Sequence, residues 1–283
     1  MPVVLDGDAL AARYRSDIKA RAQQSAFVRA GGRPGLTTIL VGDDPASRAY
    51  VSRKHADCEE LGFASQQIDL PAGITQRALL DAVDHFNRNP ASHGLLVQFP
   101  LPPQLDQFAI QERISPEKDV DGLHPVNLGR MIADQPGLRP CTPNAIVKLL
   151  QAYDVPLAGR KVAIIGRGHL VGRPLSIMIS APGIDAVPTV LHTAAGDLAA
   201  TLRDSDVIIS AAGQPDLVRA DMVKPGACVV GVGISYIDGQ MVSDIAGDVA
   251  DVAGFITPRH GSVGATTRAM LMSNLLDAAL ASA

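Results

Sequence analysis

The chain has 283 residues, of which 47% are hydrophobic and 19% are charged. This length suits two domains of ordinary size, which can bury a large core without disulfide bonds. The net charge of −4 and the pI near 5.9 argue against a basic face for nucleic acid. We therefore expect a small-molecule partner.

The three cysteines, at positions 58, 141 and 228, lie far apart and form no C-x-x-C pair. This spacing predicts neither a disulfide framework nor a zinc site, so no metal is expected. The N-terminus lacks the basic and apolar regions of a signal peptide, and no apolar segment reaches the roughly 18 residues that a membrane span needs. We expect a cytoplasmic protein without a membrane partner.

The first half of the chain predicts alternating helices and strands. Helices are expected at residues 8–30 (with Asp8 as the N-cap), 46–61 and 75–89, and strands at 36–42 and 94–98. This alternation predicts an α/β domain with a parallel sheet, where ligand groups gather at the carboxyl ends of the strands. Gln98 stands at such an end. Tyr50 and Lys54 are one helical turn apart and share a face, although with Glu59 and Glu60 nearby Lys54 could equally be an ordinary surface residue.

A polar loop at residues 118–125 contains Asp121, and residues 136–143, with three prolines, predict the joint between two domains. A helix at 144–153 should enter the second domain, where further strands are expected at 187–192, 207–211 and 228–232. Residues 255–267 predict an irregular, glycine-rich loop. The final helix, at 267–281, is expected to pack back onto the first domain.

The second domain is organised around an apolar run at residues 161–165 that is followed by Gly166, Gly168 and Gly172. Strand, tight turn and helix in this order are typical of a dinucleotide fold, where glycines let the backbone approach a pyrophosphate at the helix N-terminus. Gly172 would let the helix pack closely on the strand. The G-x-G-x-x-x-G spacing is one residue longer than the usual fingerprint, so a plain strand-to-helix turn without a nucleotide remains an alternative.

The second strand of this domain ends in His192 and Thr193, at the place where an acidic residue normally reads the ribose of NAD. No Asp or Glu stands there, and Arg167 in the glycine turn could pair with a 2′-phosphate. These two features favour NADP over NAD.

Several stretches together resemble the bifunctional methylenetetrahydrofolate dehydrogenase/methenyltetrahydrofolate cyclohydrolase family. They occur in the family's order and are residues 45–54, 97–102, 116–122, 139–143, 166–174, 225–226 and 231–235. The resemblance implies NADP-dependent oxidation of 5,10-methylenetetrahydrofolate and hydrolysis of the methenyl product to 10-formyltetrahydrofolate. It also implies a homodimer in one-carbon metabolism that serves purine biosynthesis.

For the fold, we expect a folate-binding catalytic domain at 1–140 and a Rossmann-type NADP-binding domain at 141–266, with a cleft between them. The family pattern implies that Lys54 is the central catalytic residue, Tyr50 lines the folate, Gln98 tunes Lys54 and Asp121 holds the pterin. The residues that match cofactor-contacting positions are Gly166, Arg167, Gly168, Thr193 and Ile234.

The chain departs from the family pattern at three places. Gly168 replaces a common serine, Gly231 replaces an aspartate, and the loop at 258–267 differs throughout. These changes leave open a dehydrogenase that has lost the cyclohydrolase activity, or a non-catalytic regulator that binds folate or nucleotide. The presence of Tyr50, Lys54, Gln98 and Asp121 together favours an enzyme. His260 could compensate for the altered loop, whereas His124 and His192 receive no catalytic role.

Overall fold

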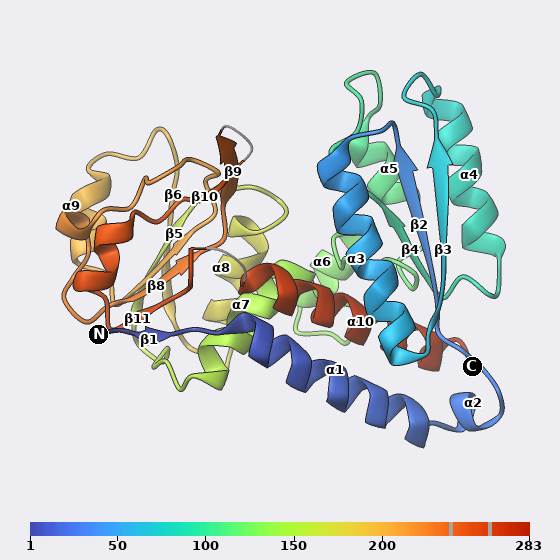
Figure 1. Ribbon diagram of the computed structural model, residues 1–283, viewed down its shortest axis with the longest axis horizontal. Helices are drawn as coiled ribbons and strands as arrows, with labels where there is room; N and C mark the ends of the chain where they lie inside the picture. The colour runs from blue at the N-terminus through green and yellow to red at the C-terminus, as the bar shows by residue number, and fades with distance from the viewer. Residues whose placement is uncertain (238–239, 260–261) are drawn as a thin grey trace. The chain divides into compact units, whose positions relative to one another are not determined.

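The computed structural model describes residues 1–237, 240–259 and 262–283 (Figure 1). The chain divides into two compact units. One, which we call the lysine unit, contains residues 13–141 and 268–283. The other, the glycine-turn unit, contains residues 1–12 and 142–267.

The lysine unit is built on a parallel sheet of three strands in the order β3-β2-β4. Their bounds are β2 Gly35–Val41, β3 Ala64–Leu70 and β4 Gly94–Val97. Every residue of the central strand β2 is buried, as expected for a strand that is covered on both faces.

Alternate residues of β2 face different helices. Ile39 and Val41 join a core with Leu79 and Val83 of α4 (Gln76–Arg88), to which α5 (Gln107–Arg113) contributes Ile110. Thr38 points the other way and contacts a histidine of α3 (Pro45–Leu61). Helices α3 and α4 therefore flank the sheet, as Figure 1 shows.

The C-terminal helix α10 (Val263–Ala281) supplies residues 268–281 to the lysine unit. The sulfur atoms of Met272 and of Cys58 in α3 lie 3.6 Å apart, and Asn274 binds two backbone carbonyls of the unit. The remaining helices here are α1 (Gly7–Gln24, from residue 13 onward), α2 (Ala26–Arg29) and α6 (Pro125–Ile132). The C-terminal helix thus packs on the part of the chain that carries Lys54.

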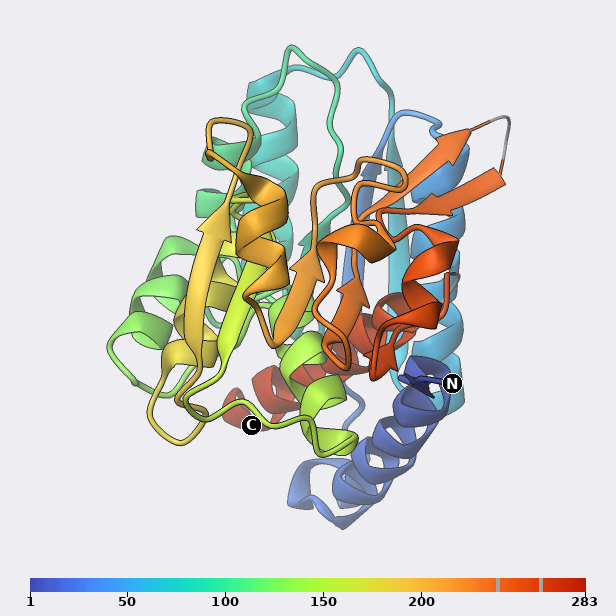
Figure 2. The ribbon, with the colours of Figure 1, turned by 90° about the vertical axis from the view of Figure 1, so that its left-hand side faces the viewer.

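The glycine-turn unit contains a six-stranded parallel sheet in the order β1-β11-β8-β7-β5-β6 (Figure 2). The strands are β1 Val3–Val4, β5 Lys161–Ile165, β6 Val187–Leu191, β7 Val207–Ser210, β8 Cys228–Gly231 and β11 Phe255–Ile256. The helices are α7 Cys141–Ala152, α8 Gly172–Ser180 and α9 Leu198–Arg203, with 3₁₀ turns η1 Ala220–Met222 and η2 Gly247–Asp251. Strands β9 (Ile234–Ile237) and β10 (Gln240–Ser243) form a separate antiparallel pair. The core of the glycine-turn unit includes apolar residues of β5, β7 and β8, such as Ala163, Ile208 and Val229.

The predicted class, two α/β domains with parallel sheets, is confirmed. The N-terminal residues 1–12 differ from the expected domain at 1–140. Strand β1 pairs with β11, so these residues lie in the glycine-turn unit. The first helix begins at Gly7 rather than Asp8, because the Asp6 carboxylate accepts hydrogen bonds from the Asp8 and Ala9 amides.

The expected loop at 255–267 is shorter than predicted. Helix α10 already begins at Val263, four residues before the expected start at Thr267. The Ser262 carbonyl accepts a hydrogen bond from the Thr266 amide, and the Ser262 hydroxyl donates to the Leu5 carbonyl. These bonds fix the first turn of the helix.

Candidate active site and cofactor pocket

The structure places Tyr50 and Lys54 together on α3. The helix starts where the Asp44 carboxylate accepts from the Ser47 amide, and it ends at Gly62, whose φ of 73° is left-handed. Lys54 is only 3% exposed, and its Nζ lies 4.6 Å from the centroid of the Tyr50 ring. The alternative that Lys54 is a surface residue is therefore wrong.

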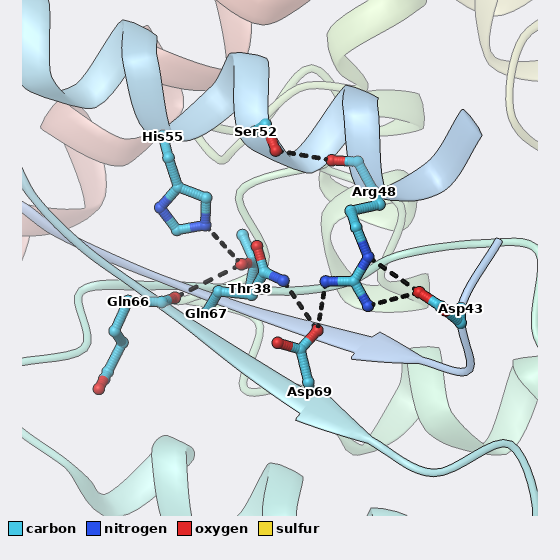
Figure 3. A network of polar contacts seen from close by, with 8 residues as sticks. All are labelled: Thr38, Asp43, Arg48, Ser52, His55, Gln66, Gln67 and Asp69. Carbon is cyan, nitrogen blue, oxygen red and sulfur yellow. Dashed lines mark hydrogen bonds and ion pairs between the residues drawn. The ribbon is translucent and has the colours of Figure 1, made fainter. Parts of the chain in front are cut away.

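Polar contacts hold the other side of α3 to the sheet (Figure 3). Arg48 forms ion pairs with Asp43 at 2.8 Å and with Asp69 of β3 at 3.3 Å, and the His55 ring nitrogen Nε2 lies 2.9 Å from the Thr38 hydroxyl of β2. Because residues 48, 52 and 55 lie roughly opposite residues 50, 54 and 57 on a helix, these contacts fix the rotation that directs Lys54 inward.

Gln98 directly follows β4 and meets Lys54 from the sheet. Its Nε2 donates to the Phe99 carbonyl at 2.6 Å, which leaves Oε1 to accept a hydrogen bond from Lys54 Nζ at 3.1 Å. A neutral acceptor therefore orients the amine without adding charge, as the sequence predicts for Gln98.

The loop at 118–122 carries two carboxylates with different surroundings. Asp119 is 1% exposed and accepts hydrogen bonds from the His124 amide and from Asn127, and burial raises its pKa to about 6. The His124 ring accepts from the Val126 amide and caps α6, so this histidine is structural. Asp121 is half-buried and makes no such local bonds among those described, which leaves its carboxylate for other partners.

Burial and neighbouring charges set the protonation of this cluster. Burial lowers the pKa of Lys54, and the Asp121 carboxylate opposes that shift. Conversely, burial raises the pKa of Asp121, and Lys54 opposes it. Burial also raises the pKa of Tyr50, so its hydroxyl stays protonated. Burial thus favours the neutral amine of Lys54, the form that can accept a proton.

Residues that the sequence analysis did not select also join this cluster. Asn274 donates to the Val120 and Arg139 carbonyls, both at 2.8 Å, and the Cys141 amide donates to the Asp121 carbonyl at 3.1 Å. These bonds bracket Asp121. In the sequence, the one sign of this role is a single asparagine within the mostly apolar final helix.

In the glycine-turn unit, two of the three glycines are required by the backbone. Gly166 has a φ of 113°, and a Cβ atom there would lie 2.6 Å from the Ala211 carbonyl oxygen. A Cβ on Gly172 would lie 1.9 Å from the Gly166 carbonyl oxygen. No heavy atom lies within 4 Å of a Cβ built on Gly168, so this glycine opens space beside the turn. The close packing predicted for Gly172 is thus present, against the turn itself.

A cavity of about 450 Å³ opens at this turn. Its lining includes Gly166, Arg167, Gly168, His192, Thr193 and Gln214, and none of the described lining residues is acidic. Glycines beside a helix N-terminus together with an arginine suit the phosphates of a dinucleotide, so the residues fit NADP. Of the remaining candidates, Ile234 begins β9 but its side chain lies outside the described structure, as does all of His260.

Asp244 supports the far wall of this cavity and was not selected from the sequence. It is fully buried and accepts hydrogen bonds from the Ser210 hydroxyl and from the backbone amides of residues 212, 213 and 214. Ala212 and Gln214 line the cavity. At Gly231, where the family carries aspartate, a Cβ would lie 2.8 Å from the Ser243 hydroxyl oxygen, so neighbouring side chains already fill that space.

Within the described parts of the chain, no group of three or more His, Cys, Asp or Glu is placed to hold a metal ion. None of the described helices combines the length and hydropathy that crossing a membrane requires.

The N-terminal and the C-terminal parts of the chain both match domain models of one protein family. Residues 5–121 match the model of the tetrahydrofolate dehydrogenase/cyclohydrolase catalytic domain, and residues 140–283 match the NAD(P)-binding domain of the same family. The bifunctional enzyme FolD of Campylobacter jejuni is 40% identical, with 99% of each chain covered and a TM-score of 0.93. The FolD of Trypanosoma brucei, solved with NADP and an inhibitor, is 37% identical over 98% of this chain and 97% of that one, with a TM-score of 0.92.

A 5,10-methylenetetrahydrofolate dehydrogenase from the silkworm Bombyx mori is 36% identical, with 99% of each chain covered and a TM-score of 0.94. The family models together span most of the chain, and they place Lys54 in the catalytic domain and the glycine turn in the NAD(P)-binding domain. The chain belongs to the tetrahydrofolate dehydrogenase/cyclohydrolase family.

Proposed function

We propose that this protein oxidises 5,10-methylenetetrahydrofolate with NADP and hydrolyses the methenyl product to 10-formyltetrahydrofolate. The observation that carries the proposal is the buried Lys54, oriented by Gln98 at 3.1 Å and stacked on Tyr50, in a domain of this family. Burying a lysine amine costs free energy of folding. A protein that only binds folate has no need of such a residue.

The hydrolytic step requires a group that takes and returns a proton. In this proposal the neutral amine of Lys54 takes a proton from the water that attacks the methenyl carbon. The resulting ammonium returns it to the ring nitrogen as the carbon–nitrogen bond breaks. The second proton of the water is released to solvent as the formyl carbonyl forms. Burial lowers the pKa of Lys54 and so favours the amine before each cycle.

Asp121 and Tyr50 serve the binding of the folate. A carboxylate accepts hydrogen bonds from the amino group and the N–H edge of a pterin ring, which is the role proposed for Asp121. The Tyr50 ring, already packed by the Lys54 side chain, offers a flat apolar surface to the substrate.

For the cofactor, we propose NADP rather than NAD, held by the glycine turn with Arg167 and Thr193 beside the 2′-phosphate. When bound, NADP supplies the acceptor for the hydride. The support is the arginine in the turn and the absence of acidic residues among the described lining of the cavity.

We also propose a cytoplasmic homodimer that acts in one-carbon metabolism and supports purine biosynthesis. The family resemblance supports the dimer and the pathway. The three cysteines, which are all buried and unbridged, suit a reducing compartment.

One assay tests the proposed function. Purified protein is given methylenetetrahydrofolate with NADP or with NAD, and the absorbance of the methenyl product is followed as it forms and decays. We expect formation that is much faster with NADP and decay above the uncatalysed rate. Formation without enzymatic decay would indicate a dehydrogenase that lacks the cyclohydrolase. The absence of both, with folate still bound, would indicate a regulator.

A further inference from the structure

One largely buried ion pair joins α10 to α3, the helix that carries Lys54. Arg268 of α10 places Nε 2.7 Å from Asp57 Oδ2, and the two side chains are 17% and 8% exposed. Each of the other ion pairs among the described residues includes a side chain that is at least 47% exposed. Exposed pairs are screened by water, whereas this pair, with one buried and one half-buried side chain, is screened much less.

The position of Asp57 connects the pair to the proposed active site. Residues 50, 54 and 57 are spaced at i, i+4 and i+7 along α3, so Tyr50, Lys54 and Asp57 form one stripe. Helix α10 packs on α3 here, as the contact between Cys58 and Met272 shows. Arg268 therefore brings a cation to the stripe that carries Lys54.

The groups that face Lys54 come from several elements. They are Tyr50 of α3, Asp121 of the loop, Cys141 of α7 and Arg268 of α10. Asp57 follows about one turn further along α3, whereas His55 contacts Thr38 on the other side of the helix. The Asp121 carboxylate favours the ammonium form of Lys54, and the Arg268 guanidinium favours the amine. Asp57 carries a charge opposite to that of Arg268 and binds it directly, so it sets where the guanidinium sits.

A buried ion pair also adds little net stability, because apolar residues of similar size often stabilise a core as well or better. We propose that Arg268, held in place by Asp57, is a positioning residue for the hydrolytic reaction, whose charge keeps Lys54 ready to accept a proton. This inference rests on the proposed function for its consequence, but its electrostatic part is measurable without turnover.

The test is the titration of Lys54 itself. The protein is labelled with ¹³C at lysine Cε, the Lys54 resonance is assigned with Lys54→Gln, and its chemical shift is followed against pH. Arg268→Met removes a cation that favours the amine of Lys54, so the titration midpoint should rise by roughly 0.5–1 unit. Asp57→Asn leaves the cation without its counter-charge, so the midpoint should fall.

The double variant Asp57→Asn/Arg268→Met removes both charges and should return the midpoint toward the wild-type value. Arg268→Lys keeps the charge and serves as the matched control. The acid limb of the hydrolysis rate against pH should move in the same directions. A purely structural pair would lower the plateau of the rate in each variant and leave the midpoint unchanged.

An unchanged midpoint in folded Arg268→Met would overturn the inference, and if that variant does not fold, an unchanged midpoint in Asp57→Asn decides in the same way. A shifted midpoint in a protein whose wild type does not hydrolyse methenyltetrahydrofolate would support the electrostatic inference and reject the proposed function. The two failures are therefore distinguishable.

Discussion

Arg167 is an exposed residue in the glycine turn, at the lining of the cofactor cavity. A Cβ built on neighbouring Gly168 would have no heavy atom within 4 Å, so the turn is open beside Arg167. A planar guanidinium binds a phosphate through two parallel hydrogen bonds. At the scale of single residues, the proposed preference for NADP over NAD is best tested at this side chain.

We predict that Arg167→Ala raises the KM for NADP by about one to two decades, because a lost charge-assisted contact costs roughly 1.5–3 kcal/mol. The KM for NAD, which lacks the 2′-phosphate, should barely change. The measurement is initial-rate dehydrogenase kinetics with each cofactor. Arg173→Ala is the control, since Arg173 is exposed in α8 but does not line the cavity. Equal losses for both cofactors would show that Arg167 does not read the phosphate.

At the scale of elements, helix α10 holds the loop that carries Asp121. Asn274 is 6% exposed, and its amide donates to the carbonyl of Val120 in that loop and to the carbonyl of Arg139 in the segment before α7. Gly122 follows with a φ of 71°, and a Cβ there would lie 2.2 Å from the Arg139 carbonyl carbon. The loop therefore has little freedom as long as Asn274 is present.

We predict that Asn274→Ala lowers the free energy of unfolding by about 1–3 kcal/mol, because the Arg139 carbonyl loses its Asn274 donor and the Val120 carbonyl keeps only the weak thiol donor of Cys141. Chemical denaturation monitored by circular dichroism measures this change. Ser273→Ala, at the partly exposed neighbouring position, should remain within about 0.5 kcal/mol of the wild type. Equal stability of the two variants would contradict the role assigned to Asn274.

Some helices and strands could be predicted from the sequence and others could not. Strands such as β2 and β5 were predictable because they are short apolar runs bounded by turn residues. Strand β3 was not predicted, because Ser65, Gln66 and Asp69 give this edge strand a polar composition. The start of α10 was placed four residues late, because Gly264 and two threonines resemble a loop.

Sequence motifs were enough to select four residues of the site, because each belongs to a short recognisable stretch. They are Tyr50, Lys54, Gln98 and Asp121. The pairing of Asp57 with Arg268 spans 211 positions, and no local pattern predicts contact over that separation. Asp244 was missed for the same reason, since its partners lie about thirty positions earlier in the chain.

For the whole molecule, we expect the two proposed activities to differ in how many of the units they need. Hydrolysis should need only the lysine unit, whereas dehydrogenation needs the cofactor pocket as well. Asp244 offers a way to test this division, because its buried carboxylate holds the backbone of residues 212–214 at the pocket.

We predict that Asp244→Asn weakens NADP binding by about tenfold or more, because the new amide group faces backbone N–H donors and loses at least one hydrogen bond. Methenyltetrahydrofolate hydrolysis without cofactor should persist. Calorimetric titration with NADP and the hydrolysis assay measure the two effects. A parallel loss of both would show that the variant disturbs the entire protein.

The central claim is that Lys54 performs the proton transfer of the hydrolytic step. Lys54→Gln keeps the length and hydrogen bonding of the side chain but cannot take up a proton. The most direct measurement supplies this variant with methenyltetrahydrofolate and follows its absorbance. We predict that enzymatic hydrolysis falls by about 10²-fold or more, while folate binding and some dehydrogenase activity remain. Hydrolysis at the wild-type rate would contradict the claim and with it the site formed by Tyr50, Gln98 and Asp121.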